Sequence, residues 1–238
     1  MSKVDLRLDW CSYEAAKFAV EHWHYSKRMP NAKLVRVGVW EENKFIGVVI
    51  FGSGANAGLG NSYGLTQFQT CELVRVALTE HKTPVSKIGA IAIKMLKKEQ
   101  SGLRLIVSFA DPEHGHAGGI YQAMNWVYVG DTTPADEFIV NGKRWHGRAL
   151  RSSFEGRGNI QGTTLERALK LDPKATKMRG SSKHRYLFPL DDAMRKQIEP
   201  LRKPYPKRER GEIDHAPQSN AETEGASPIR SLMQEVTE

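Results

Sequence analysis

The chain has 238 residues, of which 39% are hydrophobic and 26% charged, and its formal net charge at pH 7 is +8. This is ordinary globular composition, which excludes a collagen, a disulfide-rich miniprotein and a wholly disordered chain. No run of about 18 apolar residues occurs, so we expect no membrane-spanning helix. The start MSKVDLRLDW has no apolar stretch and the two cysteines lie far apart, so we expect no signal peptide and a reducing, cytoplasmic compartment.

The charge is distributed unevenly along the chain. Residues 1–140 are nearly neutral, whereas Lys and Arg outnumber Asp and Glu by 19 to 7 in residues 141–210. Residues 211–238 hold six acidic groups and one basic group. Aromatic residues lie among the basic ones, and this mixture favours a nucleic acid as partner, because rings stack on bases while cations hold phosphates. A merely solvated basic face is the alternative.

The first half of the chain predicts strands and helices in alternation. Apolar periodicity predicts strands at 3–9, 35–40, 45–51, 72–78, 103–110 and from 127, and helices at 13–23, 84–98 and 117–126. Ser12 is the expected N-cap of the first helix. The glycine-rich segment 52–64 is expected to be a mobile loop, and beyond residue 140 the pattern predicts only a short strand at 183–188.

This order predicts an α/β fold: a mixed sheet flanked by helices, antiparallel at first and then parallel through crossovers. We expect one catalytic domain over residues 1–199, with a basic, DNA-contacting part from about residue 141. Residues 200–238 are predicted to form an extended basic arm followed by a disordered acidic tail.

Three titratable groups cluster where the predicted strand 103–110 ends. Open α/β sheets place their sites at such strand ends, so Asp111, His114 and His116 are candidate site residues. The alternative is that Asp111 only caps a turn and the histidines are solvated.

A second pair of histidines follows the first helix in the segment HWHYSK. His22 and His24 can supply a general base or metal ligands, although two surface histidines are the simpler interpretation. If this loop faces Asp111, its two histidines join the Asp111 cluster, and together they include a two-histidine, one-carboxylate set of the kind that binds iron(II). The expected ligands are His22, His24, Asp111, His114 and His116.

The strand and helix between residues 72 and 98 form a third candidate. Backbone N–H groups and the dipole at the start of the helix can hold a pyrophosphate. A plain strand–helix unit without a ligand is the alternative.

The order of elements, together with the segment IYQAMNWVYVG, resembles the GNAT family of N-acetyltransferases over roughly residues 3–146. The resemblance implies an acyl-CoA between two central strands, with its pyrophosphate on residues 80–89. It also implies that Tyr121 is an acid beside the leaving group. The cofactor contacts expected from it are Arg75, Lys87, Gly89 and Asn125.

Four segments extend the resemblance over the whole chain: HWHYSKRMP, CELVRVAL, SFADPEHGHAGGIYQAMNWVYVG and SSKHRYLFPL. Together they resemble the Mom family of DNA-modification proteins of Mu-like phages. The resemblance implies a late phage transferase (a methylcarbamoylase) that converts the N6 amine of adenine in double-stranded DNA to N6-carbamoylmethyladenine. The modification protects phage DNA from host restriction endonucleases.

This chemistry needs a base to take an N6 proton and a pocket for an adenine that has left the duplex stack. The catalytic candidates are His24, Tyr25, Asp111 and Tyr121. Further candidates for stacking on the base, or for holding phosphates, are Trp126, Tyr128, Lys183, Arg185 and Tyr186. Two alternatives stay open: a conventional acetyltransferase acting on a protein or small amine, and a DNA-binding protein without catalysis. The sequence leaves open the donor of the carbamoylmethyl group and the oligomeric state.

Overall fold

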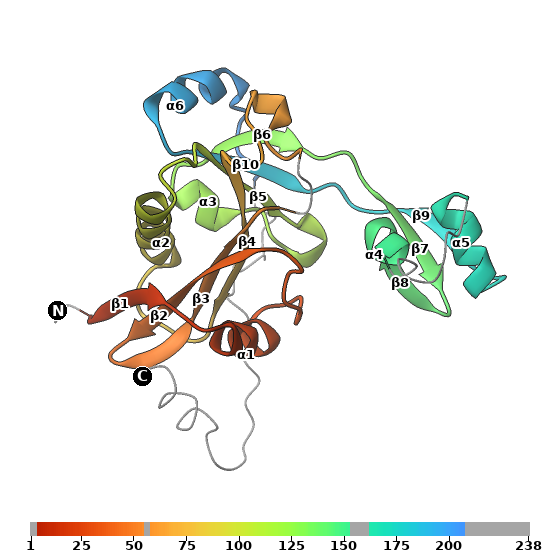
Figure 1. The fold of residues 1–238 in the computed structure, drawn as a ribbon, viewed down its shortest axis with the longest axis horizontal. Helices are drawn as coiled ribbons and strands as arrows, with labels where there is room; N and C mark the ends of the chain where they lie inside the picture. Colours follow the sequence, from red (N-terminus) through yellow and green to blue (C-terminus); the bar gives the residue numbers. More distant parts are fainter. Residues whose placement is uncertain (1–3, 55–57, 153–161, 208–238) are drawn as a thin grey trace, which may run out of the picture.

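The computed structural model describes residues 4–54, 58–152 and 162–207. A seven-stranded sheet forms the body of the protein, and a three-stranded sheet forms a separate module (Figure 1). The strands of the large sheet, in spatial order, are β1 (Leu6–Trp10), β2 (Leu34–Glu41), β3 (Lys44–Gly52), β4 (Thr70–Leu78), β5 (Leu105–Ala110), β10 (His184–Pro189) and β6 (Val127–Asp131). The mixed α/β class predicted from the sequence is confirmed.

All neighbours in the large sheet are antiparallel except β4 and β5. The expected change to parallel pairing is therefore correct for this one pair and wrong beyond it. The reason is β10, which returns from late in the chain and lies between β5 and β6. The short strand predicted at 183–188 is thus a central strand of the sheet.

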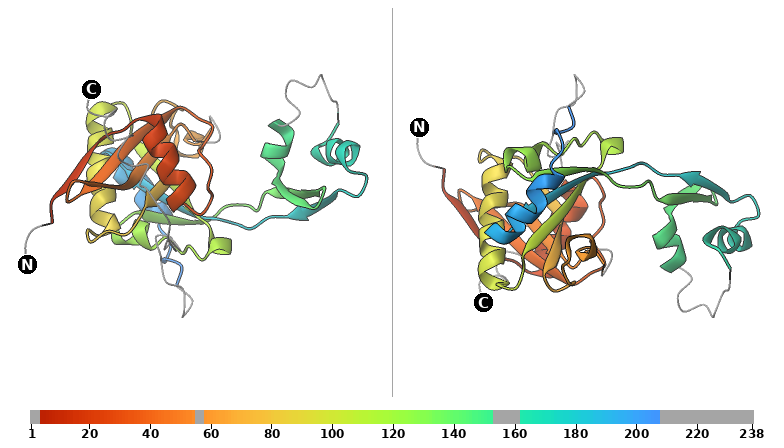
Figure 2. Two further views of the ribbon diagram at one scale, coloured as in Figure 1. Left: turned by 90° about the horizontal axis from the view of Figure 1, so that it is seen from below. Right: turned by 90° about the horizontal axis from the view of Figure 1, so that it is seen from above.

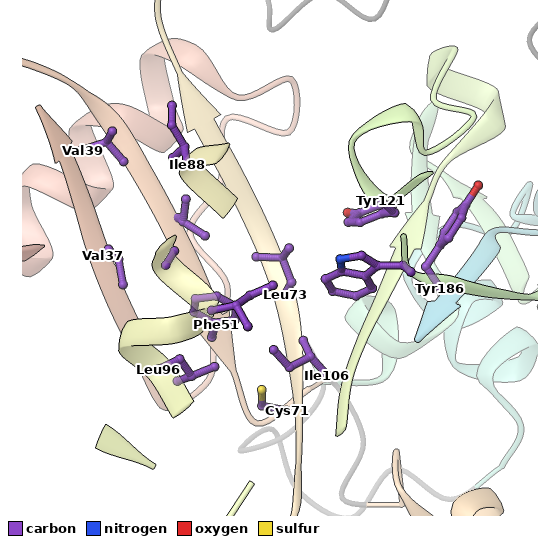
Figure 3. Packing of buried hydrophobic residues seen from close by; sticks show 14 of the residues in the cluster. Val37, Val39, Phe51, Cys71, Leu73, Ile88, Leu96, Ile106, Tyr121 and Tyr186 are labelled. Atoms are coloured by element: carbon purple, nitrogen blue, oxygen red, sulfur yellow. The ribbon is translucent and has the colours of Figure 1, made fainter. Parts of the chain in front are cut away.

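Helices cover both faces of the sheet, and side chains alternate between them along β3. Val48 and Ile50 pack with α1 (Tyr13–Trp23), whereas Val49 and Phe51 pack with α2 (Val85–Glu99). Figure 3 shows the α2 side of this core. Burying such a side chain contributes roughly 1.5–3 kcal/mol, so the two helices fix the sheet between them. Ser12 caps α1 as predicted, accepting a hydrogen bond from the Ala15 amide at 3.1 Å.

The helix expected at 117–126 is much shorter, because α3 spans only Gly119–Ala123. Gly118 and Asn125 flank it with φ of 79° and 58°, left-handed values that interrupt a helix. The glycine-rich segment is also more ordered than expected where it is described. Tyr63 in the 3₁₀ turn η1 (Asn61–Tyr63) and Leu65 are buried in a cluster with β5, β10 and α6 (Asp192–Ile198), while residues 55–57 lie outside the described ranges.

The small module projects to one side of the body (Figures 1 and 2). It consists of β7 (Asp136–Val140), β8 (Lys143–His146), α4 (Gly147–Ser152), α5 (Thr164–Leu171) and β9 (Thr176–Arg179). Its own core contains Phe138, Val140, Leu150, Ala168 and Ala175. The sequence did not predict this module, because its elements are short and its strands mix apolar residues with charged ones.

After α6 and the 3₁₀ turn η3 (Glu199–Leu201), the chain returns to β6. The Lys203 amide donates to the Tyr128 carbonyl at 2.8 Å, and the Tyr205 hydroxyl to the Trp126 carbonyl at 2.7 Å. The described part of the predicted arm therefore lies against the body. The predicted disordered tail falls in residues outside the described ranges, and the expected domain boundary at 199/200 stays a prediction. Among the described helices, none is long and apolar enough to cross a membrane.

Candidate active site

The two parallel strands of the large sheet stay together for only three residue pairs. These pairs are Thr70 with Leu105, Cys71 with Ile106 and Glu72 with Val107, although β4 continues to Leu78. A register shift against β3 leaves Val74 as an extra residue in β4, and such a bulge bends a strand. Beyond the third pair the two strands therefore separate.

A cavity of about 1150 Å³ lies at this separation. Its walls come from β4, β5, α3, the loop after α1 and the two connections to the small module. The predicted site residues that line it are His24, Tyr25, Arg75, Asp111, His114, His116, Tyr121, Lys183 and Arg185. The structure thus brings together the two histidine-containing segments, as the metal and general-base hypotheses required.

Tyr25 lies at the centre of this meeting point. Its ring centroid is 4.4 Å from that of His24, 4.7 Å from that of His114 and 5.1 Å from that of His116. The side chain is nonetheless 43% exposed. Tyr25 therefore presents an accessible aromatic face at a polar cavity, and the three imidazoles around it limit how its ring can turn.

His24 is buried, and its hydrogen bonds define its tautomer. Its Nδ1 accepts from the Ser26 amide at 3.1 Å and lies 2.9 Å from the Ser26 hydroxyl. Burial, with smaller contributions from nearby cations such as Arg75, lowers the pKa of His24 to about 3. The ring is neutral at physiological pH with its proton on Nε2, so His24 is arranged to donate a hydrogen bond at that nitrogen. This disfavours its predicted role as general base.

Asp111 is delivered to the cavity by the end of β5 and is itself buried. One carboxylate oxygen accepts from the Glu113 amide at 3.1 Å, which caps the 3₁₀ turn η2 (Pro112–His114). The other oxygen lies 3.1 Å from Lys183 Nζ and 3.4 Å from His114 Nδ1. Asp111 therefore does cap a turn, as the simpler interpretation held, but it also directs an oxygen toward two cavity side chains. Lys183, expected on a DNA phosphate, pairs with this carboxylate.

Tyr121 comes from α3 and is almost completely buried. The Ser108 hydroxyl lies 2.7 Å from the Tyr121 hydroxyl and 2.8 Å from the Leu73 carbonyl. A carbonyl can only accept, so Ser108 donates its one proton to Leu73 and accepts from Tyr121. Burial raises the pKa of Tyr121 far above its ordinary value. The phenol is therefore a neutral group that holds its proton.

Arg75 brings a positive charge into the cavity from β4. One terminal nitrogen donates to the Val74 carbonyl at 2.6 Å, whereas the buried Nε has no hydrogen-bond partner among the described residues. Burial lowers the pKa of Arg75, while Tyr25 and Glu72 act in the opposite direction, and a guanidinium stays charged in either case. Arg75 lines the cavity, so its charge can attract a carbonyl or anionic group of a ligand there.

Several other predicted residues do not line this cavity. Trp126 and Tyr186 are completely buried in the core, where the Tyr186 hydroxyl donates to the Ala117 carbonyl at 2.6 Å. Tyr128 donates to Asp131 at 2.6 Å. The structure therefore places these three rings in the packing of β6 and β10, away from a base that enters the cavity.

The expected cofactor contacts on α2 and just after α3 are also separate from it. Gly89 packs against Met124, whose sulfur would lie 2.7 Å from a Cβ at that position. Lys87 is exposed at a second, shallow cavity of about 370 Å³. Asn125 is an exposed turn residue. Of the four predicted contacts, only Arg75 faces the large cavity.

The predicted iron set is not assembled in the described residues. His22 bonds the Phe18 carbonyl through Nδ1 at 2.8 Å and stacks on the Phe18 ring. Within residues 4–54, 58–152 and 162–207, no three His, Cys, Asp or Glu side chains come together as a metal site. The described residues therefore give no support to the five-ligand prediction, and the His22 ring is engaged with Phe18 instead.

The groups that join the small module to the cavity were not among the predicted site residues. Arg144 on β8 donates to the carboxylates of both Glu113 and Glu137, with its Nη2 3.0 Å from Glu113. The Ser181 hydroxyl donates to Glu113 at 2.9 Å. No sequence signal pointed to these contacts, because the module itself was not predicted.

The loop before α2, where the resemblance placed a pyrophosphate, is held by an acidic side chain. The backbone N–H groups of Lys82 and Thr83 each donate to the carboxylate of Glu41, at 2.8 Å. Glu41 is the last residue of β2 and is only 6% exposed. An anionic group of the protein itself therefore occupies two of the amides expected to bind an anionic ligand.

These features define an α/β protein whose parallel strands part over a large cavity, with a basic module that contributes to the cavity wall. The comparison with known families specifies this further: residues 5–207 match the model of the Mom protein family, and the chain belongs to that family. It is 26% identical over 212 residues to "Methylcarbamoylase mom" of Escherichia phage Mu. This alignment covers 85% of this chain and 84% of that protein.

Solved structures show only a distant likeness. A putative acetyltransferase from Acinetobacter baylyi ADP1 gives a TM-score of 0.44 at 10% identity, covering 80% of this chain and 95% of that one. A Bacillus subtilis acetyltransferase in complex with CoA gives 0.41 at 13% identity, covering 79% and 100%. Likenesses at this level support no conclusion about a ligand of this chain.

Proposed function

We propose that the chain is a transferase that modifies adenine in double-stranded DNA, converting its N6 amine to N6-carbamoylmethyladenine. The observation that carries the proposal is the family match over residues 5–207, with a methylcarbamoylase of phage Mu as a relative. Such a modification would protect phage DNA from restriction endonucleases in the host cytoplasm.

The cavity has groups suited to an adenine that has left the duplex stack. The exposed ring of Tyr25 can stack on the base, as aromatic side chains do on extruded nucleotides. The His24 Nε2–H and the Asp111 carboxylate can bond the polar edge of the purine. The lone pair of the N6 amine is delocalised into the ring, so the amine reacts only as a proton is removed. Asp111 is the group that we propose takes this proton.

Tyr121 and Arg75 are proposed to act on the donor. Arg75 lines the cavity and carries a positive charge, which suits a carbonyl or developing negative oxygen. Tyr121 holds its proton and can give it to a leaving group. The product carries N–CH₂–CO–NH₂, which simple acyl transfer from a thioester does not make, so we derive no step through a particular donor. The acyl-CoA implied by the resemblance would meet Glu41 at the loop before α2, and the residues there do not fit its pyrophosphate.

The small module is proposed to hold the duplex. Exposed basic side chains on it include Lys143, Lys170, Lys174, Lys177 and Arg179. Lys and Arg bind the phosphate backbone without reading sequence, which positions the duplex for base extrusion. Arg185, which lines the cavity from β10, is close to where an extruded nucleotide would enter.

Mass spectrometry of nucleosides tests the proposal. Plasmid DNA from bacteria that express the chain should contain an adenosine heavier by one carbamoylmethyl group, and Asp111→Asn should abolish this species while DNA binding persists. A matched control is Asp9→Asn, which removes an exposed carboxylate on β1. Unmodified DNA from well-expressed protein, together with acetylation of peptides or small amines, would instead indicate a conventional acetyltransferase.

A further inference from the structure

The carboxylate of Glu41 is built into the loop before α2. Glu41 ends β2, next to the tight turn at Glu42 and Asn43, and its two oxygens each accept one backbone N–H group, from Lys82 and from Thr83. Burial by itself would raise the pKa of this carboxyl. The two amides, the Thr83 hydroxyl and the nearby His81 outweigh that effect and hold its pKa below the ordinary value. Glu41 is therefore a fixed negative charge at neutral pH.

The remaining amides of this stretch offer little to a second anion. Pro84 has no N–H group, and the amides of Lys87 and Ile88 both bond the Pro84 carbonyl, at 2.9 and 3.3 Å. Within the described residues 82–88, this leaves the amides of Val85 and Ser86. A diphosphate needs several convergent donors and an electropositive helix start, yet here a buried carboxylate neutralises that region.

This helix start borders the reaction cavity. Val85 lines the large cavity, whereas Pro84 and Lys87 line the shallow one. A donor that extends from the cavity along α2 would pass the loop that Glu41 occupies. The negative charges of such a donor and of Glu41 would repel each other, and the buried position of Glu41 limits the screening by salt.

We propose that the Glu41 carboxylate occupies the backbone amides before α2 that would otherwise bind a diphosphate. Glu41 thereby selects a donor without a nucleoside diphosphate. The inference rests on the proposed transferase function, whose donor it narrows. The molecule that carries the transferred group is then small, or it does not extend from the cavity along α2 past Glu41. In this account Glu41 is a specificity-determining residue that never touches the reacting atoms.

Titration calorimetry with CoA and with pantetheine, which lacks the nucleoside diphosphate, tests the proposal. In the unmodified protein, the affinity for CoA should exceed that for pantetheine by threefold at most. If neither compound binds the unmodified protein, the variants below decide. Glu41→Gln removes the charge, and its amide oxygen can accept from only one of the two N–H groups. This variant should gain at least tenfold in affinity for CoA and none for pantetheine.

The matched control is Glu42→Gln, which changes the adjacent exposed carboxylate, whose oxygen accepts from the Asp5 amide and not from this loop. Its CoA affinity should equal that of the unmodified protein. Glu41→Ala provides a second variant, and a thermal unfolding curve verifies that each is folded. The proposal is overturned if the unmodified protein prefers CoA to pantetheine by tenfold or more, or if neither folded Glu41 variant gains CoA affinity. Because no DNA is present, failure here is distinct from failure of nucleoside modification.

Discussion

Replacing Ser108 with alanine should uncouple Tyr121 from β4. Ser108 is completely buried, and its hydroxyl joins the Leu73 carbonyl to the Tyr121 phenol. The substitution leaves both groups without this partner. An unmade buried hydrogen bond costs about 1–3 kcal/mol, and water in the cavity can partly satisfy the phenol, so we expect the free energy of unfolding to fall by about 2 kcal/mol. DNA modification should fall roughly tenfold, because the acid is less well positioned.

A double-mutant cycle in urea measures this coupling. Tyr121→Phe alone should cost about 1 kcal/mol, since Ser108 keeps its bond to Leu73. In the Ser108→Ala background the same change should cost less, because it removes a hydroxyl already without its partner, giving a coupling of about 1 kcal/mol. Additive losses would refute the hydrogen-bond account. Thr70→Val is a contrasting control: its buried hydroxyl has no hydrogen-bond partner in the part of the chain that the structure describes, so the change should be neutral or stabilising.

Three further outcomes follow from the site. The pKa of His24 is about 3 in the folded chain against an ordinary 6.5, so below pH 6.5 the unfolded chain binds a proton that the folded chain does not. The contribution of His24 to stability is therefore complete above pH 6.5 and is lost as pH falls toward 3. The difference in the free energy of unfolding between the unmodified protein and His24→Gln should shrink between pH 7 and pH 4. Gly118→Ala should destabilise by roughly 2 kcal/mol or more, because φ is 79° and the new Cβ would lie 2.4 Å from the Tyr186 ring. Arg144→Gln should raise KM for duplex DNA severalfold with under about 1 kcal/mol loss of stability, since its pair with Glu113 is solvent-exposed.

For each of these three predictions, one result would contradict the physical reason given for it. A His24→Gln difference that is constant across pH in denaturant melts would mean that His24 titrates normally. Gly118→Ala with unchanged unfolding would mean that the loop can move away from Tyr186. For Arg144, the control is Lys17→Gln on α1, which removes an exposed cation of the body that pairs with Glu21. Equal effects of the two changes on KM would show that only net charge matters.

The elements of the body were predictable because each has strong periodicity. Val48 to Phe51 read as a strand, and Ser12 read as a helix cap, from local sequence alone. The position of β10 was not predictable, because residues 184–189 pair with residues 105–110, which lie more than 70 positions earlier in the chain. The small module was missed because its strands have few apolar residues and its core is small.

The candidate site was partly predictable for a similar reason. Asp111 and the histidines near it stood out by residue type at a strand end, and Arg75 and Tyr121 through the resemblance. Trp126 and Tyr186 were assigned to the ligand by their chemistry, yet in the structure that same aromatic surface serves packing. Glu41 could not be found at all, since nothing in the segment VWEEN indicates that its carboxylate meets amides some forty residues later.

The place of β10 also sets the order in which the protein can be completed during synthesis. β5 and β6 have left the ribosome long before residue 184, but neither pairs with the other, and each presents an unsatisfied edge until β10 arrives between them. The module at 136–179 is made in this interval and contributes nothing to closing that gap. Nascent chains shorter than about 189 residues should therefore carry an open sheet, exposed to pairing with other chains.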